Sequence, residues 1–154
     1  MVFEKAFPLV LRIKALAHFR GEAPAYQTAG ASGFDVRAQM EEALTLAPGE
    51  RVLVPTGLAF EVPEGYELQA RPRSGWAIKE GISLVNSPGT IDADYRGEVK
   101  IILINLGQKP VTIHPLDRIA QLVLCPVIQA ELRWSQELSS TERGAGGFGS
   151  TELR

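Results

Sequence analysis

Tyr66-Glu67-Leu68-Gln69-Ala70-Arg71 is the stretch that decides the fold class, because apolar and polar residues alternate along it. Successive side chains of a strand point to opposite faces of its sheet, so this alternation is typical of a half-buried strand. Residues 11–16 alternate in the same way, and further β-rich runs lie at 51–55, 58–62, 82–86, 98–105, 111–114 and 118–127. Turn residues such as Pro48-Gly49 separate the runs at the spacing of a sandwich or barrel, so the sequence predicts a mainly β fold.

Residues 99–106 differ from the other runs in being almost continuously apolar. Such a run is expected where a strand is covered on both faces. The cover is either a second sheet of the same chain or another subunit, and the run does not distinguish the two.

Only Ser74-Gly75-Trp76-Ala77-Ile78-Lys79-Glu80 is predicted to be a helix, with Ser74 capping its start and Gly81 ending it. Unpaired N–H groups at a helix start favour an anion, and a glycine lets a phosphate approach the backbone closely. Arg73-Ser74-Gly75 is therefore a candidate phosphate-binding site. The alternative is a capped helix beside a surface arginine.

Residues 86–97, which read Asn86-Ser87-Pro88-Gly89-Thr90-Ile91-Asp92-Ala93-Asp94-Tyr95-Arg96-Gly97, join two strong strand runs. Turn residues of this kind can present backbone N–H and C=O groups to the edge of a ligand. Asp92 is the carboxylate best placed to act as a general base. The alternative is that Asp92 and Asp94 are solvated loop acids, and their spacing alone does not indicate a metal site.

The sequence becomes small and polar from Ser139 onward and includes the glycine-rich run Arg143 to Thr151. This composition cannot supply a core layer, so we expect a β-barrel catalytic domain at 1–138 and a flexible C-terminal arm at 139–154. The backbone N–H groups of the arm can wrap phosphate oxygens, with Arg143 adding charge and Phe148 a flat face for a base. Taken alone, the composition of the arm favours a disordered tail.

Composition and charge exclude several classes of partner. The 154 residues are 45% hydrophobic and carry sixteen Lys and Arg against eighteen Asp and Glu, a formal net charge of -2. One domain is the natural reading, and no positive field favours a nucleic acid or an anionic membrane. No apolar stretch approaches the roughly 18 residues that span a bilayer. The single Cys125 is expected to be a buried thiol in a reducing compartment, so we predict a cytoplasmic protein.

Other familiar site types do not match. His18 and His114 lie far apart in the sequence and have no cysteines near them, so they do not match the ligand pattern of a zinc site. Gly144, Gly146 and Gly149 match a dinucleotide fingerprint by spacing, but the required βαβ unit is missing, and no Walker A sequence occurs. If a phosphate is the substrate, the expected cofactor is Mg²⁺ brought in by the nucleotide.

The order and spacing of five segments resemble the five motifs of the homotrimeric dUTPase family. One of them is Gly89 to Gly97, in the segment 86–97 quoted above. The others are Ala31-Ser32-Gly33-Phe34-Asp35-Val36, Pro72-Arg73-Ser74-Gly75, Arg118-Ile119-Ala120-Gln121-Leu122 and Arg143-Gly144-Ala145-Gly146-Gly147-Phe148-Gly149-Ser150-Thr151. The resemblance covers nearly the whole chain. It implies a jelly-roll β subunit in a threefold trimer, in which subunits share three active sites and each arm closes one. It also implies hydrolysis of dUTP to dUMP and pyrophosphate, which supplies dUMP and keeps uracil out of DNA.

The resemblance also implies roles around the nucleoside. Asp92 resembles the base that activates the water attacking the α-phosphorus, and Tyr95 resembles the ring packed under deoxyribose. The residues that match the uracil-reading hairpin and the strand after it are Asn86, Thr90, Ile91 and Lys100. Phe148 resembles a lid ring over the base.

Roles at the phosphates and the metal follow in the same way. The residues that correspond to phosphate contacts are Arg73, Ser74, Gly75, Gln121, Arg143 and Ser150. Asp35 resembles an acid that approaches Mg²⁺ through water and is not expected to be a direct ligand. Three departures from the family pattern concern affinity more than chemistry: Trp76 where Leu is usual, Leu116 where Gly is common, and Glu152 where Gly is usual.

Three alternative functions are weighed against this one. A dCTP deaminase, or a bifunctional relative, has a similar fold but usually reads Arg-Ser-Ser where Arg73-Ser74-Gly75 stands, and it lacks this arm. A nucleotide-responsive regulatory protein would keep the pocket, and this role can exist beside catalysis. The third alternative is a β-sandwich interaction domain, in which the candidate phosphate-binding site, Asp92 and the arm would occur together only by coincidence.

Overall fold

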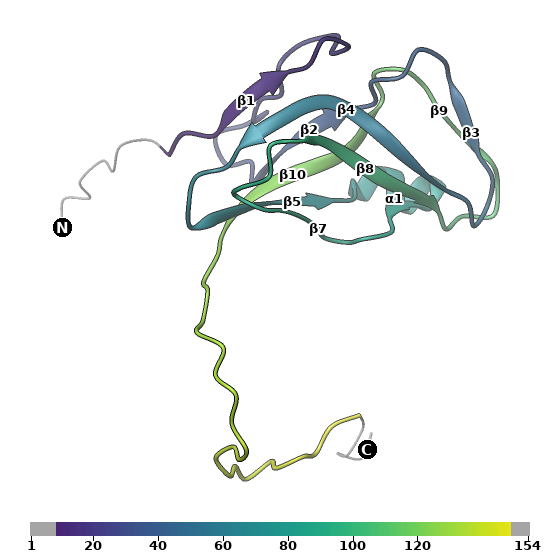
Figure 1. The fold of residues 1–154 in the computed structure, drawn as a ribbon. Helices are drawn as coiled ribbons and strands as arrows, with labels where there is room; N and C mark the ends of the chain where they lie inside the picture. Colours follow the sequence, from purple (N-terminus) through teal and green to yellow (C-terminus); the bar gives the residue numbers. More distant parts are fainter. Residues whose placement is uncertain (1–8, 149–154) are drawn as a thin grey trace.

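The fold is known from a computed structural model, which describes residues 9–148. The described residues form strands and one short helix, with little other regular structure (Figure 1). In chain order the elements are β1 (Arg12–Ala15), β2 (Gly33–Arg37), β3 (Leu44–Leu46), β4 (Arg51–Glu61), β5 (Tyr66–Arg71), α1 (Ser74–Glu80), β6 (Ile82–Leu84), β7 (Gly89–Ile91), β8 (Glu98–Asn105), β9 (Val111–Ile113) and β10 (Arg118–Pro126).

Two four-stranded antiparallel sheets face each other. One sheet has the strand order β1-β4-β8-β6, and the other has the order β2-β10-β5-β7. The short pair β3-β9 closes one end of the body. The inward side chains of both sheets form a single core, which includes Phe34, Val54, Leu68, Ile101 and Leu122. The mainly β, jelly-roll-like fold with one short helix is therefore confirmed.

Strand β4 unites two runs that the sequence separates. It extends through residues 51–55 and most of 58–62, and its pairing with β8 shifts register between Pro55 and Ala59. Gly57 lies in this bulge with a φ of 67°, a conformation that favours glycine. A Cβ at Gly57 would also lie only 3.0 Å from Gln39 Cγ. The bulge brings the Gly57 amide towards the start of β8.

Strands β2, β3 and β7 were not predicted. β3 and β7 have three residues each, too few to show a period of two. β2 follows a run of small residues, which hides its short alternating pattern. Within the strand, Phe34 and Val36 are buried, whereas Asp35 and Arg37 are not. Pairing with β10 and β5 stabilises these short strands, and a local pattern does not reveal that pairing.

Strand β8 is covered on one face only within the chain. Val99, Ile101 and Leu103 are buried, whereas Ile102 and Ile104 on the other face are half-exposed. Leu53 lies opposite Ile102 in the register and is 54% exposed. Val85 donates its N–H to the Ile102 carbonyl from the other side. We call Leu53, Val85, Ile102 and Ile104 the outer apolar patch.

Two local expectations are corrected. Ser74 begins α1 but does not cap it, because Arg73 occupies the cap position and makes no side-chain capping bond there. Gly81 does end the helix, in the left-handed conformation and with its N–H bonded to the Ala77 carbonyl. Cys125 is half-buried instead of buried, and its Sγ lies 3.6 Å from an Arg71 guanidinium nitrogen.

The C-terminal segment leaves the body directly after β10. The last strand ends at Pro126, well before the expected boundary at 138, and Figure 1 shows the following residues running away from both sheets. Large apolar side chains along it are exposed, and Trp134 reaches 99% exposure. Within residues 9–148, no helix has the length and apolar character needed to cross a membrane.

Replacing Gly81 by Ala is expected to destabilise the fold more than replacing Gly65 by Ala. Both glycines have positive φ, which costs an alanine about 1 kcal/mol. A Cβ at Gly81 would also lie 2.5 Å from the Gly107 nitrogen, whereas a Cβ at Gly65 meets nothing within 4 Å. Urea unfolding should therefore show a loss of about 2 kcal/mol or more for Gly81→Ala, against about 1 for the control. Equal losses would contradict a backbone collision at Gly81.

Candidate active site

The loop between β7 and β8 carries Asp92 and Tyr95. Asp92 directly follows β7, whose Ile91 pairs with Leu68 of the central strand β5. The Asp92 side chain is exposed, and its carbonyl accepts the N–H of Tyr95 at 3.2 Å. The turn therefore places the carboxylate and the ring close together at one end of the sheet.

A hollow of about 470 Å³ lies beside this turn, and we call it the Tyr95 hollow. Five residues predicted from the sequence line it, namely Thr90, Ile91, Asp92, Tyr95 and Lys100. Asn86 is not among its walls; its side chain packs beside Gly89, where an added Cβ would lie 2.9 Å from Asn86 Nδ2. Asn86 therefore supports the turn in this structure.

The Tyr95 ring is held by the turn that follows it. Its hydroxyl donates to the Glu98 carbonyl at 2.9 Å. A Cβ at Gly97 would overlap the ring and hydroxyl of Tyr95, so glycine is needed there. The ring remains partly exposed and forms a wall of the hollow.

Glu98 lines the same hollow and was missed in the sequence. Its Oε1 accepts the Gly57 N–H at 2.8 Å and lies 2.8 Å from His18 Nε2. Its Oε2 lies 3.9 Å from Lys100 Nζ. The only local signal was an acid next to Gly97, because Gly57 and His18 are brought to it by the fold.

A second, cationic hollow of about 480 Å³ lies at the start of α1, and we call it the Arg73 hollow. Arg73 lies 3.3 Å from one Asp35 oxygen, and Arg118 lies 3.4 Å from the other. Two basic residues missed in the sequence, Arg37 and Lys79, also line it. The excess of positive charge suits an anionic group such as phosphate.

Other predicted phosphate residues lie at or behind this hollow. Gly75 lines it and has open space around its α-carbon, while Ser74 is exposed beside it. Gln121 donates to the Pro72 carbonyl at 3.0 Å, which fixes the loop before Arg73. Between residues 9 and 148, no cluster of three or more His, Cys, Asp or Glu is arranged to hold a metal ion.

The two hollows lie towards opposite ends of β5. Asp92 follows Ile91, the partner of Leu68, whereas Arg73 lies beyond the last residue of β5, Arg71. By this register Asp92 is level with Glu67, six residues before Arg73, and a strand rises about 3.3 Å per residue, which separates them by roughly 20 Å along the strand. The hollows share no lining residue. A single chain therefore does not bring Asp92 and Arg73 into one site.

Asp92 also borders an acidic hollow of about 590 Å³ on its other side. Its walls include the carboxylates of Glu64, Glu67, Asp92 and Asp94. The Asp92 end of the sheet is thus acidic and the Arg73 end is basic. Such ends attract each other when two copies of the chain meet.

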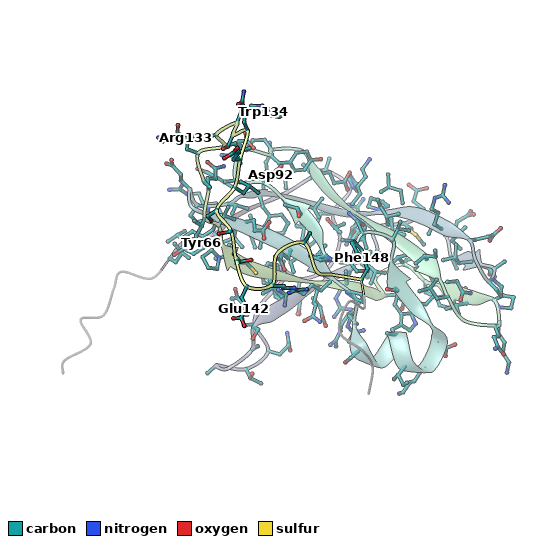
Figure 2. The ribbon with its side chains drawn as sticks, turned by 90° about the horizontal axis from the view of Figure 1, so that it is seen from below. Tyr66, Asp92, Arg133, Trp134, Glu142 and Phe148 are labelled. Atoms are coloured by element: carbon teal, nitrogen blue, oxygen red, sulfur yellow. The ribbon has the colours of Figure 1, made fainter. Side chains whose placement is uncertain are left out.

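The described part of the arm approaches neither hollow through a hydrogen bond. The Arg143 Nε donates locally to the Gly146 carbonyl at 2.8 Å, and in the segment before the arm Arg133 lowers the pKa of the Glu131 carboxyl by donating to it. Figure 2 labels Asp92 on the body and Phe148 near the end of the described arm, and the Phe148 ring is fully exposed. Ser150 and Glu152 lie outside the described residues.

Known proteins resemble this chain along most of its length. The family model for dUTPase matches residues 20–152. The deoxyuridine 5'-triphosphate nucleotidohydrolase of Bdellovibrio bacteriovorus is 65% identical over 143 residues, which are 93% of this chain and 96% of that relative. The chain belongs to the dUTPase family. Its function as a dUTP-hydrolysing enzyme, predicted from the motifs, is thereby confirmed.

Solved dUTPase structures share the fold. The dUTPase of Staphylococcus bacteriophage 80alpha with dUPNHPP is 29% identical and aligns with a TM-score of 0.78 over 94% of this chain and 99% of its own. A variant dUTPase from phage phi11 of S. aureus, described with a structural Mg(II) ion, is 24% identical with a TM-score of 0.73 over 83% of this chain and 97% of its own.

Proposed function

We propose that this dUTPase builds each active site from the Tyr95 hollow of one subunit and the Arg73 hollow of another. The observation that carries the proposal is the placement of Asp92 and Arg73 towards opposite ends of β5. Hydrolysis of a nucleoside triphosphate needs a positioned water and neutralised phosphate charge in the same place. A second copy supplies the missing half without any rearrangement of the sheets.

Asp92 is the catalytic base in this proposal. Its exposed carboxylate lies at the edge of the Tyr95 hollow, where it can orient and deprotonate the water that attacks the α-phosphorus. The bond from water oxygen to phosphorus forms as the bond to the pyrophosphate oxygen breaks. The products are dUMP and pyrophosphate.

The Tyr95 hollow holds the deoxyuridine. In the described sheet order β7 has a strand neighbour on one side only, so backbone groups of Thr90 and Ile91 are available to read the uracil edge. Cytosine presents the wrong pattern of donors and acceptors, and the methyl group of thymine would collide. Tyr95 packs under deoxyribose and leaves no room for a 2′-hydroxyl, while Asn86 supports the turn and Lys100 lines the hollow.

The Arg73 hollow holds the phosphates. Arg73, Ser74 and Gly75 contact them, and Gln121 adds a further polar contact or keeps the preceding loop in place. The guanidinium groups around Asp35 supply fixed positive charge where negative charge is concentrated. Preorganised groups of this kind need no reorganisation during the reaction.

The subunits form a homotrimer with three shared sites. The outer apolar patch supports this assembly, because Leu53 and Val85 flank Ile102 on a sheet face that the chain leaves uncovered. The opposite charges of the two sheet ends support it as well. Threefold closure uses each end once per subunit.

Residues 139–154 act as a lid in this proposal. Arg143 contacts the γ-phosphate, Phe148 covers uracil and Ser150 binds a phosphate through its hydroxyl. The fully exposed ring of Phe148 supports the idea, since it is not packed against the barrel of its own subunit. Closing only over a bound nucleotide would exclude bulk water and join recognition to catalysis.

Mg²⁺ enters with the triphosphate. Asp35 already shares its two oxygens between Arg73 and Arg118, which fits a contact to the ion through water better than direct ligation. When bound, Mg²⁺ neutralises charge on the phosphates and on the leaving pyrophosphate. The enzyme would act in the cytoplasm, where its unpaired Cys125 stays reduced.

Asp92→Asn is expected to lower pyrophosphate release from dUTP about a hundredfold or more, because the amide cannot accept the proton from water. Binding of a non-hydrolysable dUTP analogue should persist. Asp94→Asn is the matched control and should keep near wild-type turnover.

Substrate selectivity is tested with the wild type and Mg²⁺. dUTP should be hydrolysed far faster than UTP, dCTP or dTTP, whereas ammonia release from dCTP would support the deaminase instead.

Mixed trimers test the shared site. Arg73→Ala and Asp92→Asn subunits should each be nearly inactive alone. Co-expressed trimers that contain both kinds of subunit should regain about a third of wild-type turnover, because one site of the three in each of them pairs an intact Asp92 with an intact Arg73. The two subunits carry different affinity tags so that only mixed assemblies are assayed. Purified mixed trimers without regained activity would refute sharing between subunits.

Deleting every residue after Glu142 tests the lid. The barrel should keep its unfolding midpoint, because the described residues of this stretch, 143–148, lie outside the buried core, while turnover of dUTP should become far slower. Arg143→Ala and Phe148→Ala in the full chain separate the contribution of charge from that of the ring. A fully active truncated enzyme would rule out the lid role.

A further inference from the structure

Glu98 connects three segments that lie far apart in the sequence. Its carboxylate accepts the Gly57 N–H in the β4 bulge and faces His18 in the turn after β1. Its own backbone belongs to the first residue of β8. The Glu98 side chain is only 14% exposed, so the interactions form in a partly desolvated place where they are stronger than at a surface.

The backbone of Glu98 is also the support of the Tyr95 ring. The Tyr95 hydroxyl donates to the Glu98 carbonyl at 2.9 Å, and the ring folds back over Gly97. The ladder between β8 and β4 shifts register between Pro55 and Ala59. At this shift the Glu98 side chain accepts the Gly57 N–H, beside the bond from the Thr56 hydroxyl to the Val99 carbonyl. Removing the Glu98 carboxylate would take away one of these two attachments and loosen the start of β8.

His18 completes the bridge from the opposite side. Leu16 donates its N–H to the Gly57 carbonyl at 2.8 Å, so the turn that carries His18 is itself attached to the bulge. The His18 ring lies 2.8 Å from Glu98 and is 49% exposed on its side chain. Lys100 Nζ lies 3.9 Å from the second oxygen of Glu98 and faces the same hollow.

We propose that Glu98, held by Gly57 and His18, is a positioning residue that sets the discrimination between deoxyribose and ribose by keeping the Tyr95 ring in place. This inference rests on the proposed role of Tyr95 in excluding a 2′-hydroxyl. Exclusion by crowding requires a ring that cannot yield, because a ring that moves by a few tenths of an ångström accommodates the extra oxygen. Glu98 itself touches no reacting atom.

The test measures kcat and KM for dUTP and UTP with Mg²⁺. Glu98→Ala should reduce the preference for dUTP over UTP about tenfold, mainly by a better kcat/KM for UTP. Glu98→Gln should restore the preference, because its carbonyl oxygen still accepts from Gly57 and from His18. Glu61→Ala is the matched control, since it removes an exposed acid on β4 whose ion pair with Arg12 lies outside the hollow.

Two further variants keep the test decisive. Tyr95→Phe retains the ring but loses its bond to Glu98, so the effects of Tyr95→Phe and Glu98→Ala should be far from additive in the double variant. His18→Ala leaves the Gly57–Glu98 bond intact and should therefore fold, with a smaller loss of preference of about two- to threefold. It substitutes for Glu98→Ala if that variant unfolds.

The outcomes separate this inference from the proposed role of Tyr95. If Tyr95→Ala leaves the preference for dUTP unchanged, the role of Tyr95 fails and the inference fails with it. If Tyr95→Ala removes the preference but folded Glu98→Ala and His18→Ala keep it, the inference alone is overturned. A loss of thermal stability without a change in preference would likewise reduce Glu98 to a structural brace and refute the proposal.

Discussion

Strand β5 pairs with β10 along residues 66–71 and with β7 through Leu68, Gln69 and Ala70, and the placement of both hollows depends on these two pairings. β7 delivers Asp92 to one end of the sheet. At the other end, β5 leads through Pro72 into Arg73 and α1, where Gln121 of β10 bonds the connecting loop. A strand is stiff and has a fixed rise, so the same pairing that positions Asp92 and Arg73 also keeps them apart.

The chain consequently has the features of an incomplete unit. Its core is closed between the sheets, yet the outer apolar patch lies on the reverse of β8, and the segment between β10 and the arm carries exposed large apolar residues such as Ile128 and Trp134. Exposed apolar surface of this kind is costly in water and is removed by association. In the proposed trimer, assembly would bury this surface and complete the active sites in the same step. An isolated subunit therefore has a complete core but only separate parts of the proposed site.

Sequence patterns predicted the parts that depend on local order. The alternation at β5, the extent of α1 and the glycine that ends it are properties of neighbouring residues, and so are the motif residues around Asp92 and Arg73. What the patterns missed depends on partners distant in the chain. β7 is a strand because β5 lies beside it, and Glu98 makes its contacts because a bulge at Gly57 and a turn at His18 converge on it. No spacing rule connects those three positions.

Two departures from the family pattern fall in the same place. Trp76 and Leu116 both line the Arg73 hollow, and neither lines the Tyr95 hollow. Leu116 has a φ of 67°, which costs a leucine roughly 1–2 kcal/mol relative to glycine. The Leu116 N–H bonds the Ala38 carbonyl and its own carbonyl accepts from Arg37, so the strained residue also holds one of the basic side chains of the hollow. Variation at these positions therefore acts on the shape and charge of the Arg73 hollow, while the residues around Asp92 and Tyr95 are not in contact with it.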